Sequence, residues 1–192
     1  MGMNLQKILY KKQSLRKIAI EERKLINTLN RSDFEHKLAN MSHDYLKDGA
    51  IIAGYYPINH ELNIIPLLKK LSSIGHKVLL PCITKSKILD FREWEMNKKL
   101  TKNFYSIPEP NNELLYTPDI VYVPALQYGK GLHRLGYGGG FYDQTINYYR
   151  KNFSTKFIGV CFPNQIKNNI PHEKYDQKVD FIIDLGEKQS IG

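Results

Sequence analysis

Short, unbroken apolar runs constrain the fold of this chain more than any other feature of its sequence. Residues 50–57 (AIIAGYYP) and 77–81 (KVLLP) have the length and composition of strands that are buried on both faces. Between them, apolar side chains recur at helical spacing over residues 64–71 and stop before Gly75. A strand, a helix and a second strand at this spacing form a βαβ unit, in which the two strands must be parallel.

The same pattern continues along the rest of the chain. Residues 119–124, 156–162 and 179–184 are predicted strands, and residues 141–150 are a predicted helix between the first two of them. We therefore predict one α/β domain over residues 1–192. It contains an open, mainly parallel sheet with helices on both faces, in a Rossmann-like three-layer arrangement.

The N-terminal quarter is predicted to be helical. Apolar residues follow a 3.6-residue period over residues 14–29, which predicts an amphipathic helix. Ser32 with Glu35 three residues later matches a capping box and predicts the start of a second helix that ends at Gly49. The alternating residues 90–95 (DFREWE) predict a half-exposed or edge strand.

The positive charge of the chain is concentrated at one end. The formal charge is +9, and residues 1–31 carry eight Lys or Arg against two Glu. Such a segment suits a nucleic acid, an anionic membrane or a polyanionic small molecule. No apolar stretch has membrane-spanning length and the N-terminus lacks the apolar core of a secretory signal, so we expect a cytoplasmic protein without membrane contact. The spacing of Cys82, Cys161 and the histidines is not that of metal ligands, which argues against a zinc enzyme.

The strongest functional signal lies between a predicted strand and a predicted helix. Five glycines fall within residues 131–140, and such density suits a backbone that approaches a ligand closely. Ligands bind at the carboxyl ends of strands in open α/β sheets, and a helix N-terminus favours anions. The segment is neither a P-loop nor a dinucleotide fingerprint. Because Arg134 suits phosphate oxygens and Asp143 suits Mg²⁺ beside phosphates, we predict a site for a magnesium nucleotide.

Residues 129–143 (GKGLHRLGYGGGFYD) resemble the signature of the 5-formyltetrahydrofolate cyclo-ligase family, also called 5,10-methenyltetrahydrofolate synthetases. Further segments that resemble family motifs, in family order, are KKQSLRK (11–17), YYPINHEL (55–62), YSIPEP (105–110) and YDQKVDFII (175–183). The resemblance spans nearly the whole chain. It implies an enzyme that uses ATP and Mg²⁺ to convert 5-formyltetrahydrofolate to 5,10-methenyltetrahydrofolate, with release of ADP and phosphate, by phosphorylation of the formyl oxygen and ring closure.

The resemblance also implies roles for individual residues. Those implied to bind ATP are Lys12, Arg16, Arg134, Leu135, Gly136, Tyr137, Gly138, Gly139, Gly140, Phe141 and Tyr142. Those implied to contact the folate are Tyr56, Glu61, Tyr105, Tyr137, Gly138, Gly139, Gly140, Phe141 and Tyr142. Arg134 and Lys12 are implied to be catalytic, because they would spread the charge of the transferred phosphate, and Asp143 with Asp180 is implied to hold Mg²⁺. The chain departs from the family pattern at Tyr105, often tryptophan, at Phe141, usually tyrosine, and at Tyr175, usually histidine.

The residues by themselves leave alternatives open. Lys12 and Arg16 also fit a solvated helix face, and Glu61 also fits a helix cap. A phosphosugar-binding enzyme or sensor could use the glycine-rich segment for a monophosphate, without ATP chemistry. A nucleic-acid-binding protein could place its basic N-terminal segment on a phosphate backbone. Our expectation is a monomer whose partners are ATP and the folate, without nucleic acid.

Overall fold

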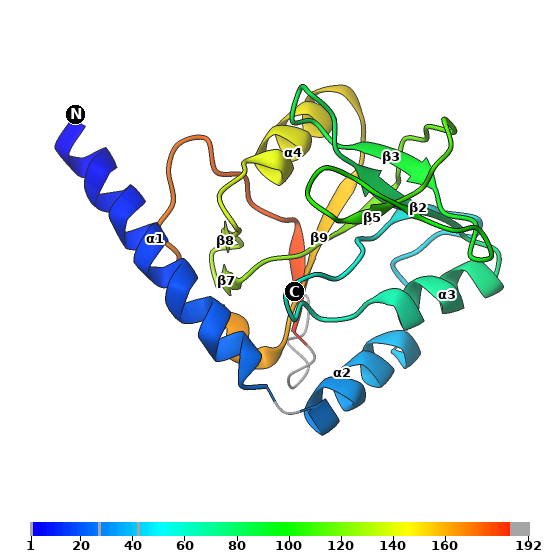
Figure 1. Ribbon diagram of the computed structural model, residues 1–192, viewed down its shortest axis with the longest axis horizontal. Coiled ribbons are helices and arrows are strands. Elements are labelled where there is room, and N and C mark those ends of the chain that lie inside the picture. Colours follow the sequence, from blue (N-terminus) through cyan, green and yellow to red (C-terminus); the bar gives the residue numbers. More distant parts are fainter. Residues whose placement is uncertain (1, 27, 42, 185–192) are drawn as a thin grey trace.

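The centre of the protein is a six-stranded sheet with the strand order β11-β9-β6-β1-β2-β3 (Figure 1). It is seen in a computed structural model, which describes residues 2–26, 28–41 and 43–184. The strands are β1 (Ile51–Ala53), β2 (Lys77–Cys82), β3 (Asp90–Glu93), β6 (Ile120–Val123), β9 (Lys156–Val160) and β11 (Phe181–Ile183). All neighbours are parallel except β2 and β3, so the predicted edge strand is confirmed as an antiparallel edge.

Helices cover both faces of this sheet. The helices α2 (Thr28–Asn40) and α3 (Ile65–Ser73) pack on one face, where Ile52 of β1 contributes to the core. The helix α4 (Phe141–Asn152) packs on the opposite face, where the next residue, Ala53, contributes to a second core cluster. Side chains alternate between the two clusters because successive residues of a strand point to opposite faces. The predicted three-layer α/β fold is therefore confirmed.

Two small sheets complete the strands and were not predicted from the sequence. One joins β4 (Thr101–Lys102) to β5 (Pro108–Glu109). The other joins β7 (Gln127–Gly129) to β8 (Arg134–Leu135) and, after the 3-10 turn η1 (Pro163–Gln165), to β10 (Ile166–Lys167). Strands of two or three residues are too short to show a hydrophobic period. The β7–β8 hairpin matters for the site described below, because residues 136–140 of the glycine-rich segment directly follow β8.

The N-terminal quarter is helical, as predicted, but the first helix and its buried face were predicted wrongly. Helix α1 (Gly2–Lys24) begins earlier and ends earlier than the predicted helix, and in Figure 1 it forms a long rod along one side of the molecule. Two residues of the predicted apolar face, Ile18 and Leu25, are 53% and 84% exposed. The buried face instead carries Lys12, Ala19 and Arg23. Polar contacts therefore hold much of this helix against the body.

The predicted capping box at Ser32 is also wrong. Ser32 lies inside α2, which begins four residues earlier, at Thr28, and ends at Asn40 instead of Gly49. The Glu35 carboxylate does not reach back to a cap, because it accepts a hydrogen bond from the Asn63 side chain at 3.4 Å. A contact with a residue far along the chain thus replaces the local one that the sequence pattern suggested.

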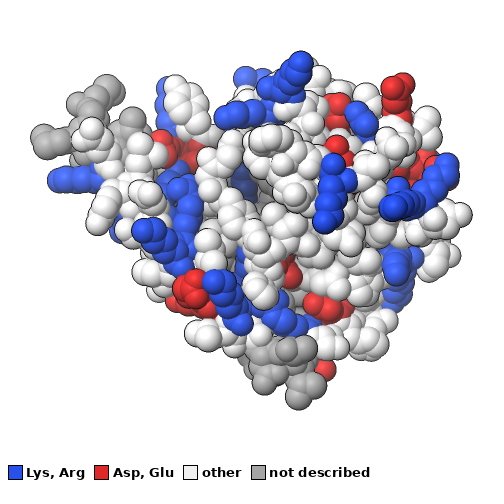
Figure 2. Space-filling model, in the orientation of Figure 1, with Lys and Arg blue, Asp and Glu red and all other residues white. Residues whose placement is uncertain are grey.

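Lysine and arginine side chains are spread over the face shown in Figure 2, along α1 on one side and again on the opposite side. Acidic and uncharged side chains interrupt them, so this face carries no continuous basic stripe. Within the described part of the chain, none of the helices combines the length and the apolar character needed to cross a bilayer.

Candidate functional site

A cavity of about 520 Å³ opens where the strand order of the central sheet reverses. From β1 the chain crosses to β2 on one side, and from β6 it crosses to β9 on the other. Tyr55 and Tyr56, which follow β1, and Pro124, which follows β6, line the cavity. Crevices of this kind at the carboxyl ends of parallel strands are the usual ligand sites of open α/β folds, and the volume suits a small molecule.

Almost every site residue predicted from the sequence lines this one cavity. Those that do are Lys12, Arg16, Tyr56, Glu61, Tyr105, Arg134, Leu135, Gly136, Tyr137, Gly138, Gly139, Gly140, Phe141, Tyr142 and Asp143. The exception is Asp180. Side chains from the first helix, the first strand, the glycine-rich segment and the β4–β5 region therefore meet at one place, although they are far apart in the sequence.

The glycine-rich segment ends at the N-terminus of α4. Gly138 and Gly140 have positive φ angles of 98° and 77°, which favour glycine, and Gly140 is the N-cap residue. No side chain caps the first turn of α4, so its amide groups are available to an anion at the cavity wall. These features are what the predicted phosphate cradle requires.

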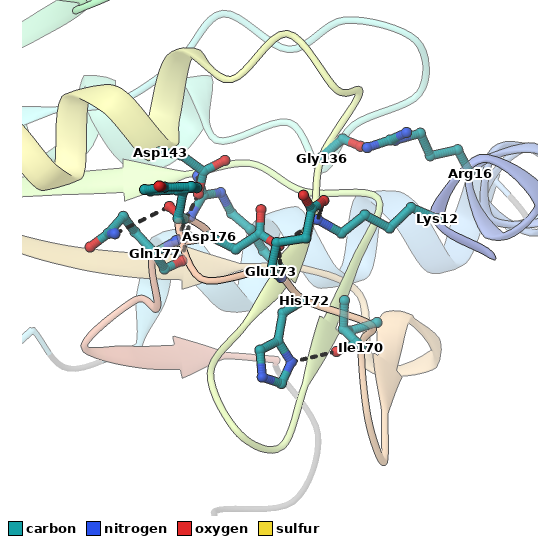
Figure 3. Close-up of polar contacts among 11 residues, drawn as sticks. Lys12, Arg16, Gly136, Asp143, Ile170, His172, Glu173, Asp176 and Gln177 are labelled. Atoms are coloured by element: carbon teal, nitrogen blue, oxygen red, sulfur yellow. Dashed lines mark hydrogen bonds and ion pairs between the residues drawn. The ribbon is translucent and has the colours of Figure 1, made fainter. Parts of the chain in front are cut away.

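Two cations of α1 line the cavity, and one of them, Arg16, contacts the glycine-rich segment. The Arg16 Nε donates to the carbonyl oxygen of Gly136 at 2.9 Å, and a Cβ atom at Gly138 would lie 3.1 Å from Arg16 Cζ. Figure 3 shows Lys12 on the same side of α1, pointing to Glu173 and Asp176. Its Nζ lies 2.8 Å from Glu173 Oε1 and also contacts Asp176 Oδ2, and the residue is only 5% exposed. The solvated-face interpretation of this pair is therefore wrong.

Arg134 is held by a second ionic arrangement. Its Nη2 lies 2.8 Å from Asp143 Oδ1, and its Nη1 donates to the carbonyl oxygen of Gln177 at 2.8 Å. The Gln177 amide donates to the same Asp143 oxygen at 2.8 Å. Since Glu173, Asp176 and Gln177 belong to one segment, residues 173–177 bind both the Lys12 and the Arg134 sides of the cavity (Figure 3).

The predicted pairing of Asp143 with Asp180 is wrong. Asp180 accepts hydrogen bonds from the Phe157 amide at 2.6 Å and from Arg150 Nη2 at 3.2 Å. Arg150 is in the last turn of α4, whereas Asp143 is in its first turn. Asp180 precedes β11, and a residue that precedes a parallel strand lies at the amino edge of the sheet, opposite the cavity. The second aspartate that lines the cavity, besides Asp143, is Asp176, which was not predicted from the sequence.

Glu61 is presented to the cavity by a loop in an unusual conformation. Asn59 and His60 have positive φ angles of 45° and 62°, which are uncommon for residues other than glycine. Glu61 Oε2 accepts a hydrogen bond from the Ile58 amide at 2.9 Å. The residue is 7% exposed, and this burial raises the pKa of its carboxyl group to about 7, although the nearby charge of Arg23 opposes the rise. A carboxylate placed in this way can accept hydrogen bonds from the amino-pyrimidine edge of a ligand.

Aromatic rings form the remaining wall of the cavity. The ring of Tyr105, which is more than half exposed, meets that of Phe141 edge to face, with centroids 6.0 Å apart. Tyr142 lies deeper, and burial raises the pKa of its hydroxyl group well above the ordinary value. A flat ring system could pack against these side chains while its polar edge faces Glu61.

Arg23 is a further residue of the site that was not predicted from the sequence. It is 1% exposed and contacts both the loop that presents Glu61 and Tyr137 of the glycine-rich segment. The spacing of Lys12, Arg16 and Arg23 was an available signal, because steps of four and seven residues keep three side chains on one face of a helix.

These features define the class of protein to which the chain belongs. The cavity lies in an open α/β sheet and is lined by a helix N-terminus, three arginine or lysine side chains and a buried carboxylate. This combination is typical of α/β enzymes that act on phosphate-bearing substrates.

The model of the 5-formyltetrahydrofolate cyclo-ligase family matches residues 9–184, and the chain belongs to this family. It is 28% identical over 182 residues to the 5-formyltetrahydrofolate cyclo-ligase of Mycoplasma genitalium, covering 90% of this chain and 96% of the relative. It is 30% identical over 125 residues to the probable 5-formyltetrahydrofolate cyclo-ligase of Schizosaccharomyces pombe. This match covers 57% of this chain and 61% of the relative. The solved structure of Aquifex aeolicus 5,10-methenyltetrahydrofolate synthetase has the same fold, with a TM-score of 0.77, 22% identity and coverage of 94% of this chain and 96% of that one.

Proposed function

We propose that this member of the cyclo-ligase family converts 5-formyltetrahydrofolate to 5,10-methenyltetrahydrofolate in the cavity at the strand switch point, and consumes ATP in doing so. The observation that carries the assignment to this cavity is that all residues expected to bind ATP or the folate line it. The proposal includes a single domain over residues 1–192 that acts as a cytoplasmic monomer on its two small substrates, without nucleic acid or a membrane surface. Two buried, unpaired cysteines are consistent with a reducing compartment.

The lining of the cavity suits both substrates. Lys12, Arg16 and Arg134, together with the N-terminus of α4, suit the triphosphate of ATP. Glu61 with Tyr56 and Tyr105 offers a carboxylate and aromatic rings, which suits a pteridine.

The chemistry requires positioning more than a reactive side chain. The formyl oxygen attacks the γ-phosphorus, the bond from phosphorus to the bridging oxygen breaks, and ADP leaves. The folate N10 then attacks the activated formyl carbon, loses its proton, and phosphate leaves as the ring closes. Phosphorylation makes the formyl oxygen a good leaving group, which explains the need for ATP. Lys12, Arg134 and the amides at the start of α4 would stabilise the negative charge on the phosphate during its transfer.

The donor set of the cavity also fits a magnesium ion. Asp143 and Asp176 both line it, and one or two carboxylates together with phosphate oxygens and water are sufficient for Mg²⁺. When bound, the ion would neutralise charge on the phosphate oxygens. No group of three or more His, Cys, Asp or Glu side chains that could hold a metal occurs among the described residues, so the phosphates would have to complete the coordination.

Two cations of the cavity form ion pairs with nearby carboxylates. Lys12 pairs with Glu173 and Asp176, and Arg134 pairs with Asp143. A magnesium triphosphate brings both signs of charge, so it can offer oxygens to the cations and a cation to Asp143 and Asp176 at the same time. Replacement of these ion pairs by contacts with the ligand would keep the nearly buried charged side chains paired.

The experiment that tests the proposal mixes purified protein with 5-formyltetrahydrofolate, Mg²⁺ and ATP and follows the absorbance of the methenyl product, with ATP omitted as control. We expect an ATP-dependent rise for the wild-type protein and a rate at least about a hundredfold lower for Arg134→Gln. Arg150→Gln is the matched control, because this arginine also has a carboxylate partner but lies at the far end of α4. Absence of an ATP-dependent rise with folded protein would contradict the proposal.

A further inference from the structure

A buried arginine, Arg23, connects the Glu61 loop to the glycine-rich segment and has no ion-pair partner among the described residues. Arg23 Nη2 donates to the carbonyl oxygen of Asn59 at 2.6 Å and contacts the hydroxyl of Tyr137, while Nη1 donates to the carbonyl oxygen of Ala125 at 3.3 Å. Its Nε has no hydrogen-bond partner, and none of the carboxylates in residues 2–26, 28–41 and 43–184 lies within ion-pair distance. Buried charges are normally paired, so this arrangement calls for a functional explanation.

The arginine holds the loop that presents Glu61. The carbonyl oxygens of Asn59 and His60, the two residues with positive φ angles, accept hydrogen bonds from Arg23 and from Arg31 Nη1 at 2.6 and 2.9 Å. Residues other than glycine keep such a conformation only where the surroundings enforce it. The two arginines supply that restraint, and Glu61 is the next residue of the loop.

The same guanidinium group fixes the glycine-rich segment. Besides its contact with the Tyr137 hydroxyl, Arg23 Cζ lies 5.6 Å from the centre of the Tyr137 ring. Tyr137 is otherwise substantially exposed at the cavity, so its contacts with Arg23 and with the Asn59 side chain restrain its ring. One side chain thus joins the glycine-rich segment to the loop that presents Glu61.

The charge of Arg23 also acts on the Glu61 carboxylate through space. It opposes the effect of burial and so favours the ionised form of Glu61. The other titratable groups that interact with Glu61 are the hydroxyls of four tyrosines, which are neutral near pH 7 because burial raises the pKa of each of them: Tyr55, Tyr128, Tyr137 and Tyr142. Arg23 is therefore the cation near Glu61 that can keep it a hydrogen-bond acceptor for the folate.

We propose that Arg23 is a positioning residue of the reaction: it fixes the Glu61 loop and Tyr137 in the geometry that binds the folate, and it supplies the positive charge that balances the Glu61 carboxylate. This inference rests on the proposed roles of Glu61 and Tyr137. Arg23 does not line the cavity, so it acts through these two residues and not by contact with the substrate.

Steady-state kinetics of Arg23→Gln, Arg23→Lys, Glu61→Gln and the control Arg150→Gln, with each substrate varied from pH 6 to 9, test the inference. For Arg23→Gln we expect the KM for 5-formyltetrahydrofolate to rise about tenfold and the KM for ATP to rise less than about threefold. The acidic limb of kcat/KM for the folate should move to higher pH, because loss of the positive charge makes Glu61 harder to ionise. Arg23→Lys keeps the charge, so it should restore the pH profile and recover only part of the KM.

Two outcomes would overturn the inference, and both differ from failure of the underlying assignment. If Arg23→Gln lowers kcat alone, with both KM values and the pH profile as in the wild type, Arg23 only stabilises the fold. If Arg23→Gln does not fold, the folate KM of Arg23→Lys tests the inference instead. A wild-type value would show that the hydrogen bonds of the guanidinium group to Asn59 and Tyr137 are not needed, and would refute the inference. An unchanged folate KM in Glu61→Gln would instead refute the role of Glu61 itself.

Discussion

Glu61→Gln should make the protein more stable at alkaline pH while it impairs folate binding. Burial raises the pKa of the Glu61 carboxyl group from 4.5 to about 7. The folded state therefore binds this proton more tightly than the unfolded state does, and the free energy of unfolding falls as the pH rises from about 4.5 to about 7. Glutamine stays uncharged at every pH and keeps an oxygen for the Ile58 amide, so the variant avoids this loss.

The size of the effect follows from the difference between the two pKa values. The difference between 4.5 and about 7 corresponds to about 3 kcal/mol of folding free energy when the group is ionised in both states. Relative to the wild type, we expect Glu61→Gln to gain about 3 kcal/mol at pH 8.5 and less than about 1 kcal/mol at pH 5.0. In the enzyme assay the same variant should raise the folate KM more than the ATP KM, since an amide accepts fewer hydrogen bonds from the pteridine than a carboxylate.

Urea unfolding followed by the fluorescence of Trp94, which lies in the core, measures the stability at the two pH values. The exposed Glu113→Gln is the matched control, and its stability should follow that of the wild type at both. The comparison must be made between variants, because other carboxylates, such as Glu93 beside Lys77, have lowered pKa values and change stability in the opposite direction. A gain that is equal at pH 5.0 and 8.5, or no gain at pH 8.5, would refute the reasoning.

Three further predictions test other parts of the site and the fold. Asp143→Asn should raise the Mg²⁺ concentration needed for half-maximal rate, whereas Asp180→Asn should cost about 1 kcal/mol of stability in urea and leave the Mg²⁺ dependence unchanged; equal Mg²⁺ dependence of both variants would contradict the choice of Asp143. Tyr105→Ala should raise the folate KM several-fold, by about 1 kcal/mol, while Tyr105→Phe, which keeps the ring, stays near the wild type; loss of activity in both would point to the hydroxyl instead. Gly159→Ala should destabilise the fold by about 2 kcal/mol, because a Cβ atom there would lie 2.7 Å from the buried ring of Tyr128. Gly131→Ala is the control and should not destabilise the fold, because no atom lies within 4 Å of its Cβ position. Equal urea midpoints for the two variants would contradict the prediction and show that the Tyr128 ring can move.

The central sheet could be predicted from the sequence because its strands are buried on both faces. An unbroken apolar run such as residues 119–124 is a direct consequence of that burial, and the observed β6 falls within it. The glycine-rich segment could be predicted for a related reason, since only a close ligand or unusual φ angles explain its composition, and Gly138 and Gly140 have such angles.

The first helix could not be predicted correctly, because its buried face is polar. A hydrophobic period finds the side of a helix that avoids water, but Lys12 and Arg23 are buried by ionic and carbonyl contacts with distant segments. Asp180 was misassigned for a geometric reason, since its position before a parallel strand puts it at the edge of the sheet away from the cavity. Asp176 gave no local signal, because only the tertiary path of residues 173–177 brings it to Lys12.

The contacts of residues 173–177 with α1 and with Arg134 have a consequence for biosynthesis. Lys12 and its partner Glu173 are separated by 161 positions, so the ribosome makes the carboxylate partner long after the helix. Until residues 173–177 have emerged, the nascent chain lacks Asp176 of the cavity wall and the carboxylates that pair with Lys12. A complete cavity should therefore form only after these residues have been synthesised.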